Sequence, residues 1–508
     1  MILVALLLLL LLGGAGAWAA ERAGPDWPGR VALAVLAAAA ALVLALWIGA
    51  DAAALPGRGG WIAEARAPWI APLGISFHLA MDGLSLVMVA LTVGLGIAAV
   101  LASRIDIHRR TGFFHFTVLW TLAGAVGVFL AMDLFLFFVF WEAMLVPMYF
   151  VIAVWGHERR VPAAIKFVVY TQGSGLLLLA ATLALAAAHH DRTGIASFAY
   201  ADLLATDLSP AAGLWIMLGF FAAFAVKLPV VPLHTWLPDA HTEAPTGGSV
   251  ILAGILLKTG GYGLVRFVWP LFPDAAAAFA PVAMALGVAG ILYGAVLAFA
   301  QTDVKRLVAY TSVAHLGFVL LGVFAGTAKA LQGAVFQMVA HGLSTGALFI
   351  VAGLLQARLG TRDMGRMGGL WPAMPRLGAL TLFFAVAALG LPGLGNFVGE
   401  FLVLWGTLER SIPFAAVAAM GLVTAVLYAL ALVQRTFHGE APHGDAPAGP
   451  PPRDAGPGAT VALAVMALAV AWLGLFPQTV LDAAAPALEA LLQAADGTVT
   501  AAAGGPGR

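Results

Sequence analysis

The chain has 508 residues, of which 62% are hydrophobic and only 10% are charged, whereas about 25% are charged in an ordinary soluble domain. This composition argues against a water-soluble globular fold. Lysine plus arginine and aspartate plus glutamate both number 25, so no basic surface is available for nucleic acid. With no cysteine, the chain can form no disulfide, thiolate zinc site or cysteine-ligated iron–sulfur cluster.

The first twenty residues form one apolar run with no basic residue ahead of it. A cleaved secretory signal, which is the alternative, begins with a basic segment. We therefore interpret this run as the first membrane helix.

Apolar runs of membrane-spanning length recur along the whole chain. A hydrocarbon core of roughly 30 Å needs about 20 helical residues, and the alternation typical of a β-barrel is absent. The sequence predicts an all-α polytopic membrane protein with about 14 transmembrane helices. The expected spans lie near 1–20, 30–50, 80–102, 112–131, 133–155, 162–188, 211–231, 247–267, 276–299, 303–325, 330–357, 377–408, 413–436 and 459–485.

Basic residues are concentrated in alternate loops, and lysine and arginine are retained preferentially on the cytoplasmic side of a membrane. Together with the even number of spans, this bias predicts that both termini are periplasmic in a bacterial inner membrane. The loops assigned to the cytoplasm contain Arg104, Arg109, Arg110, Arg159, Arg160, Lys166, Lys305, Arg306, Arg358, Arg362, Arg366 and Arg376.

Several ionisable side chains lie inside the apolar spans. A charge at mid-bilayer costs roughly 3 kcal/mol or more, so each such residue is a functional candidate. Burial and pairing change the proton affinity of these groups, which suits them to storing and transferring protons. The candidates are Glu142, Lys227, Lys258, His315, His341 and Glu400.

Structural roles are the alternatives for these residues. Glu142 could form a packing hydrogen bond, Lys227 could reach an interface, and Glu400 could pair with a neighbouring subunit. A lone histidine in a helix is often a hydrogen-bonded core residue. Three further histidines, His115, His234 and His241, have weaker cases because they lie near span ends or in a loop.

Two spans contain a proline in their apolar middle, at Pro229 and Pro392. Proline breaks a helix, which membranes tolerate where the freed carbonyls face protein or water. The spans are the seventh and the twelfth, so they have opposite orientations, as in inverted repeats. Two unrelated kinks are the alternative. The predicted units are 1–111 (helices 1–3), 112–267 and 268–436 (inverted five-helix repeats), 437–458 (flexible Pro/Gly-rich loop) and 459–508 (helix 14 and tail).

Two stretches carry a family resemblance: VKLPVVPLHTWLPDAHTEAPTGGSVILAGILLKTGGYGLVRF at 226–267 and QTDVKRLVAYTSVAHLGFV at 301–319. They closely resemble the antiporter-like subunits of the proton-translocating NADH:quinone oxidoreductase, respiratory complex I. The resemblance runs at least from Asp133 to Trp405. Glutamate at position 400 matches the M-type subunits, whereas sister subunits usually have lysine there.

The resemblance implies a role for each buried residue. Glu142 and Lys227 would form a switchable pair, and Lys258 would be the central relay. His315 and His341 would belong to a hydrated axis, with Glu400 as the terminal relay.

The resemblance also implies which subunits carry the cofactors. FMN, iron–sulfur clusters, quinone and the redox reaction are expected in partner subunits, with no cofactor, metal or redox centre in this chain. The expected partners are other membrane subunits of complex I, including sister antiporter-like subunits, and the lipid bilayer. The alternatives are a subunit of a multisubunit cation/proton antiporter or membrane-bound hydrogenase, and a stand-alone solute transporter.

Overall fold

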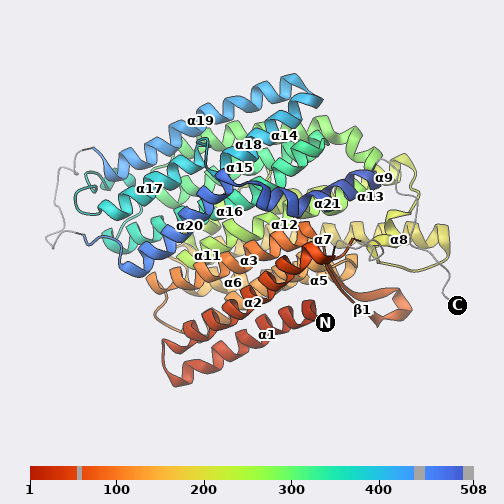
Figure 1. The fold of residues 1–508 in the computed structure, drawn as a ribbon, viewed down its shortest axis with the longest axis horizontal. Helices are drawn as coiled ribbons and strands as arrows, with labels where there is room; N and C mark the ends of the chain where they lie inside the picture. The colour runs from red at the N-terminus through yellow and green to blue at the C-terminus, as the bar shows by residue number, and fades with distance from the viewer. Residues whose placement is uncertain (54–59, 440–451, 496–508) are drawn as a thin grey trace.

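The computed structural model describes residues 1–53, 60–439 and 452–495. Its helices run side by side in one bundle, with α1 and α2 at one edge and α19 at the opposite edge (Figure 1). Among the described residues, thirteen helical stretches are long and apolar enough to cross a membrane. The expected all-α membrane architecture is confirmed.

The first part of the chain contains two edge helices, two helices that are largely buried, and a β-hairpin. The helix α1 packs against α2 and α4, and the strands β1 and β2 pair antiparallel. The hairpin was not expected from the sequence, since its residues lie between apolar spans. The elements are α1 (Ile2–Ala20), η1 (Glu21–Ala23), α2 (Trp27–Ala53), β1 (Ala63–Ile70), η2 (Ala71–Leu73), β2 (Ile75–Met81), α3 (Gly83–Ala102), η3 (Ser103–Ile105) and α4 (Thr111–Leu130).

The next part contains the first broken helix and a long span with two π-helical segments. The elements are α5 (Leu134–Ala143), α6 (Leu145–Trp155), α7 (Arg160–Thr193), α8 (Tyr200–Leu204), α9 (Pro210–Lys227), α10 (Trp236–Glu243), α11 (Thr246–Ile251), the π segment η4 (Leu252–Leu256), α12 (Leu257–Gly263), the π segment η5 (Leu264–Val268) and α13 (Trp269–Leu271).

The last part contains the second broken helix. The elements are α14 (Pro273–Phe299), α15 (Val304–Ala325), α16 (Ala328–Leu359), η6 (Met364–Arg366), α17 (Pro375–Ala388), α18 (Gly395–Arg410), α19 (Ile412–Phe437), α20 (Pro457–Leu475) and α21 (Gln478–Ala495).

Two expected spans differ in detail. The span expected at 377–408 is the broken pair α17 and α18, each too short to cross alone, which explains thirteen long helices instead of fourteen. The span expected at 459–485 ends at Leu475, and the chain continues as the separate helix α21. This last helix packs against α3 and α16.

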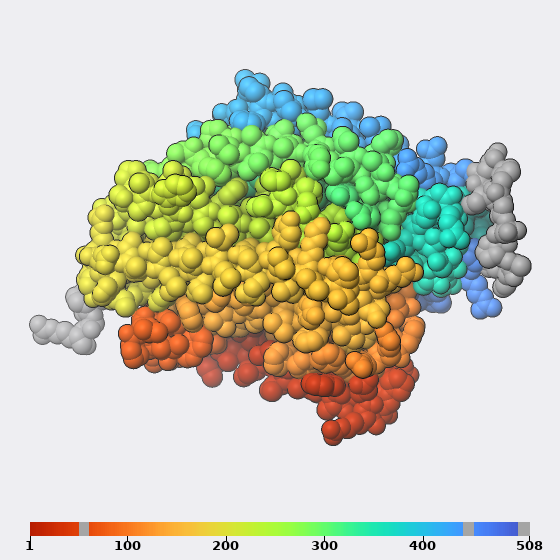
Figure 2. All heavy atoms as spheres, turned by 180° about the vertical axis from the view of Figure 1, so that it is seen from behind, coloured from red at the N-terminus to blue at the C-terminus, as the bar shows by residue number. Residues whose placement is uncertain are grey.

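Burial identifies the centre of the bundle. The span Thr246–Leu271 is completely buried and α15 and α16 are almost so, whereas α20 is mostly exposed. Exposed apolar residues such as Val169 and Leu176 of α7 face outwards. The segment 160–193 crosses the face of the molecule shown in Figure 2 as a yellow-orange band. An apolar exterior around a buried centre that contains polar groups is the expected arrangement in lipid.

The two halves share a local pattern. Asp133 caps the first turn of α5 and forms an isolated β-bridge with Ala199. Asp303 caps the first turn of α15 and forms one with Asp363. These positions correspond in the two predicted five-helix repeats and so support that division, which stays a prediction.

Candidate functional site

The first helix break places Lys227 in the interior. The helix α9 ends at this residue, and helix resumes only at Trp236, whose indole nitrogen donates to the carbonyl of Val226 across the break at 2.9 Å. Lys227 is fully buried, and its Nζ has no hydrogen-bond partner. It lies 5.1 Å from the ring centre of Trp141 and 5.9 Å from that of Phe167. Aromatic faces stabilise a buried ammonium only in part.

Glu142 lies near Lys227 without touching it. It belongs to the last turn of α5 and is half-buried, and its Oε1 has no hydrogen-bond partner. It is the acidic residue whose charge acts on Lys227, but no ion pair within 4.0 Å joins them. The two members of the predicted pair are therefore neighbours that are not in contact in this structure.

Lys258 lies on α12 between the two π segments, in the buried centre. A π-helical turn leaves backbone carbonyls free for other partners and is frequent at functional sites. The Lys258 Nζ donates to the carbonyl of Ala253 and to His341 Nδ1, the latter at 2.6 Å. Lys258 is thus bonded directly to a histidine on another helix, α16.

His315 and Glu400 form the next group. His315 Nδ1 lies 2.9 Å from Glu400 Oε1, and Gln337 donates to the same oxygen at 3.1 Å. The hydroxyl of Tyr428 lies 3.3 Å from His315 Nε2. The rings of His341 and His315 are 5.4 Å apart, so this group lies next to the lysine–histidine pair.

The second helix break brings Glu400 into position. The helix α17 ends at Ala388 and α18 begins at Gly395, with Pro392 in the connection. Gly390 has a φ of +79°, and a side chain there would lie 2.7 Å from Glu400 Oε2. A glycine at this turn therefore permits both the backbone conformation and the close approach of the carboxylate.

Sequence reasoning missed or gave too little weight to three further buried polar residues. His241 had been given a weaker case, but it is fully buried on α10, stacked on Phe349 at 4.6 Å, with both ring nitrogens unpaired. Gln337 and Tyr428 are uncharged, so burial of a charge could not reveal them.

A second polar cluster lies where the loop between α6 and α7 meets the start of α15. Lys305, expected in a loop, is completely buried, and its Nζ contacts His157 Nε2 at 3.2 Å and the carbonyl of Ala244 at 3.0 Å. Burial and the charges of Lys305 and Arg362 lower the pKa of His157 to about 3. Burial raises the pKa of Asp106, whose carboxylate accepts two hydrogen bonds from Thr246.

A buried ion pair lies beyond Lys258 on the same span. Arg266, at the end of the span expected at 247–267, is 2% exposed. Its Nη2 lies 2.5 Å from Asp82 Oδ2, and its Nε donates to the hydroxyl of Tyr262 at 3.2 Å. This pair connects the start of α3 with the segment η5.

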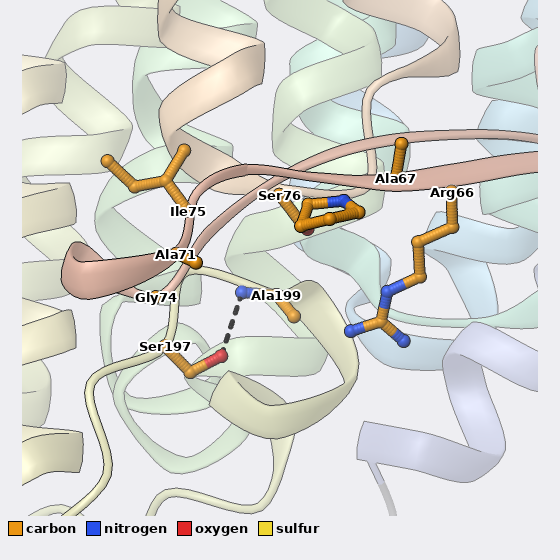
Figure 3. Close-up of a pocket in the computed structure, with 9 residues that line it drawn as sticks. Arg66, Ala67, Ala71, Gly74, Ile75, Ser76, Ser197 and Ala199 are labelled. Carbon is orange, nitrogen blue, oxygen red and sulfur yellow. Dashed lines mark hydrogen bonds between the residues drawn. The ribbon is translucent and has the colours of Figure 1, made fainter.

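A cavity of about 430 Å³ lies apart from these groups, under the β-hairpin (Figure 3). It is lined by Arg66 and Ser76 of the hairpin and by Ser197, whose hydroxyl accepts a hydrogen bond from the amide of Ala199. None of the six predicted relay residues lines it. Within residues 1–53, 60–439 and 452–495, no cluster of three or more His, Asp or Glu could hold a metal ion.

Comparisons with known proteins identify the family to which the chain is similar. Residues 131–427 match the family described as NADH:quinone oxidoreductase/Mrp antiporter, transmembrane. The chain is 52% identical over 504 residues to NADH-quinone oxidoreductase subunit M of Pseudomonas aeruginosa, covering 97% of this chain and 98% of that protein. It is 54% identical over 448 residues to the Escherichia coli K12 subunit M, covering 87% and 88%.

Solved structures show the same fold. A chain of respiratory complex I from Thermus thermophilus with bound NADH matches with a TM-score of 0.86 and 33% identity, over 97% of this chain and all of that one. A chain of the Mrp complex from Dietzia matches with a TM-score of 0.81 at 22% identity, over 97% of this chain and 99% of that one, a likeness of fold alone. The chain therefore belongs to the NADH:quinone oxidoreductase/Mrp antiporter family of transmembrane subunits, with the M subunits as its relatives.

Proposed function

We propose that this chain is the proton-translocating M-type subunit of an NADH:quinone oxidoreductase. One observation carries the proposal: Lys258, His341, His315 and Glu400 form an almost continuous array through the buried centre, with only the gap between the two imidazole rings unbridged by hydrogen bonds. Groups of adjustable proton affinity in this order can pass a proton from one to the next.

The hydrogen-bond geometry fits one set of proton positions. With Lys258 as the donor to His341 Nδ1, a neutral His341 holds its proton on Nε2, which has no hydrogen-bond partner. A neutral His315 with its proton on Nδ1 donates to Glu400 and accepts from Tyr428 at Nε2. A water molecule between the two rings would complete the path.

Glu142 and Lys227 would control this array. When they are apart, as here, the fully buried Lys227 and the half-buried Glu142 each lack an ionic partner, which is unfavourable for a charge. Closing the pair would stabilise both charges, and opening it would favour release of a proton from Lys227 towards Lys258. Their separation in this structure corresponds to the open state.

The remaining assignments follow from the relatives, which are subunits of an enzyme complex. In our proposal FMN, iron–sulfur clusters and quinone belong to partner subunits, and this chain contributes no redox centre. Its neighbours would be sister antiporter-like subunits in a bacterial inner membrane, with both termini on the periplasmic side. The N-terminus and the β-hairpin lie at the same end of the bundle (Figure 1).

Native gel analysis of mildly solubilised membranes tests the proposal, with an NADH dehydrogenase stain and mass spectrometry of the bands. We expect this chain in a large band that oxidises NADH. The second candidate, a cation/proton antiporter subunit, is favoured by the fold shared with the Mrp complex. Recovery of the chain only in a smaller band without NADH oxidation, together with sodium/proton exchange in vesicles, would replace our proposal by that one.

A further inference from the structure

A groove lies where three spans meet at one end of the bundle. The helices α3 and α16 end here and α20 begins here, and between them is a cavity of about 380 Å³. Its lining includes Arg104, Arg358, Ile350, Leu354, Gly458 and Ala459. None of the proton-array residues lines this groove.

The rim of the groove carries positive charge without a matching acid. In the part of the chain that the structure describes, neither Arg104 nor Arg358 forms an ion pair. Arg358 donates one hydrogen bond, to the carbonyl of Arg453 at 2.9 Å. A guanidinium has five N–H donors in a fork that fits phosphate oxygens, so both arginines keep donors available for an anion.

Backbone at the same rim adds to this charge. The helix α20 begins at Pro457, and its N-cap residue, Gly456, provides no side-chain cap. The amides of Gly458 and Ala459 therefore belong to the unsatisfied first turn, which favours negative charge. A side chain at Gly456 or Gly458 would meet nothing within 4 Å, so the approach to this turn is open.

The interior of the groove is apolar. Leu354 and Ile350 lie one and two turns before Arg358 on α16, which extends the apolar wall about 12 Å away from the charged rim. Both are almost completely buried, at 4% and 2% exposure, so a bound molecule would contact mainly the partly exposed wall residues Leu101 and Ala462. Leu101 and Ala102 of α3 and Ala462 of α20 complete this wall.

We propose that this groove binds one anionic phospholipid, with its phosphate at Arg104 and Arg358 and an acyl chain along Leu101 and Ala462. The charge favours an anion, and the apolar wall distinguishes a lipid from a free anion. The position of the charged rim along the membrane normal also fits a phospholipid headgroup, because the rim lies where the spans meet the membrane surface. The distribution of basic loops assigns this end to the cytoplasmic leaflet, where basic pockets between helices bind acidic headgroups.

Photo-crosslinking of the intact complex in nanodiscs tests this site. The probe is phosphatidylglycerol with a photoreactive group in one acyl chain, and the readout is labelling of the peptide that contains Ala459 and Ala462. We expect Arg104→Gln with Arg358→Gln to lower this labelling by about tenfold, because each arginine contributes to binding an acidic headgroup. The double variant with lysine at both positions keeps most of the labelling.

The control is Arg22→Gln with Arg366→Gln, two exposed arginines outside the groove, and it should leave the labelling unchanged. Unlabelled phosphatidylglycerol should compete, whereas phosphatidylcholine and inorganic phosphate should not. Equal labelling by a phosphatidylcholine probe, or unchanged labelling in the glutamine pair, overturns the proposal. Displacement by millimolar phosphate would identify a free-anion site instead. An unchanged NADH-stained complex on native gels shows that the variants fold and assemble.

Discussion

At the scale of single residues, Glu400 combines a buried charge with defined partners. Its Oε1 is close to both His315 and Gln337, so a neutral amide at this position could keep part of the hydrogen bonding but could not titrate. We expect Glu400→Gln to lower proton pumping in membrane vesicles by roughly tenfold or more, the usual scale of a lost proton-transfer group.

The matched control for this variant lies on the same helix. Glu409 is exposed and pairs with Lys329 at 2.6 Å, so Glu409→Gln should pump normally. Glu400→Lys should retain some pumping, because a lysine can also carry a proton. Normal pumping by Glu400→Gln would mean that titration at this position is dispensable.

His157 predicts a pH dependence of stability. Its pKa falls from 6.5 to about 3 in the folded protein because of burial and the charges of Lys305 and Arg362. As pH falls below 6.5 the unfolded chain therefore binds a proton that the folded chain does not, so stability is lost towards acid pH.

Thermal unfolding of the assembled complex at pH 7.5 and 5.5 measures this loss. We expect His157→Gln to reduce the drop in midpoint between the two pH values, since glutamine can still accept from Lys305 but does not titrate. The exposed His190 provides the control, and His190→Gln should keep the full drop. An identical drop in His157→Gln would contradict the assignment.

The sequence singled out the six candidate relay residues because a charge inside an apolar run costs free energy that only function or pairing offsets. The sequence could not show that Lys258 contacts His341, because these two residues are 83 positions apart in the chain and lie on different helices. Hydropathy alone also placed Lys305 in a loop, because this residue lies close to the end of an apolar run. The burial of Lys305 and Arg266 depends on the neighbouring loop at His157 and on Asp82.

At the scale of elements, both predicted helix breaks are present and each ends beside a charge. Lys227 is the last residue of α9, whereas Glu400 follows the second break on α18. The two charges therefore do not occupy corresponding positions of the two predicted repeats, whereas the helix caps at Asp133 and Asp303 do. The β-hairpin and α21 lie outside the predicted repeats. No hydrophobic periodicity in the sequence distinguished the hairpin from a loop, or α21 from the span before it.

Close packing of α5 on α7 fixes the position of Glu142. A side chain at Gly175 of α7 would lie 1.8 Å from Glu142 Oε1, whereas one at Gly173 would meet nothing within 4 Å. Gly175→Ala should therefore displace the carboxylate without changing its charge. We expect proton pumping to fall on the order of tenfold, since small misplacements of a reacting group are costly.

Gly173→Ala is the matched control on the same helix and should pump normally. Both variants should assemble, because alanine is a better helix former than glycine. The quinone reductase turnover of Gly175→Ala should fall together with pumping, since the two are coupled in the proposed function. If Gly175→Ala pumps like Gly173→Ala, the position of Glu142 does not matter.

At the scale of the whole molecule, the buried pair of Asp82 and Arg266 joins the N-terminal helices to the centre. Asp82 also caps α3 by accepting from the amide of Ser85 at 2.9 Å, and asparagine can keep this bond. Asp82→Asn therefore removes the charge alone and leaves Arg266 unpaired in the interior. Breaking a buried pair in this way costs about 3–5 kcal/mol.

The exposed pair of Arg192 and Asp207, at 2.8 Å, gives the comparison, since exposed pairs contribute about 0–1 kcal/mol. Thermal unfolding should show a large loss for Asp82→Asn and almost none for Asp207→Asn. Adding Arg266→Met to Asp82→Asn should recover part of the loss, because no buried charge then remains unpaired. A double variant as unstable as the sum of its single variants would instead mean that the two residues act independently, and that this pair does not hold α3 against the buried centre.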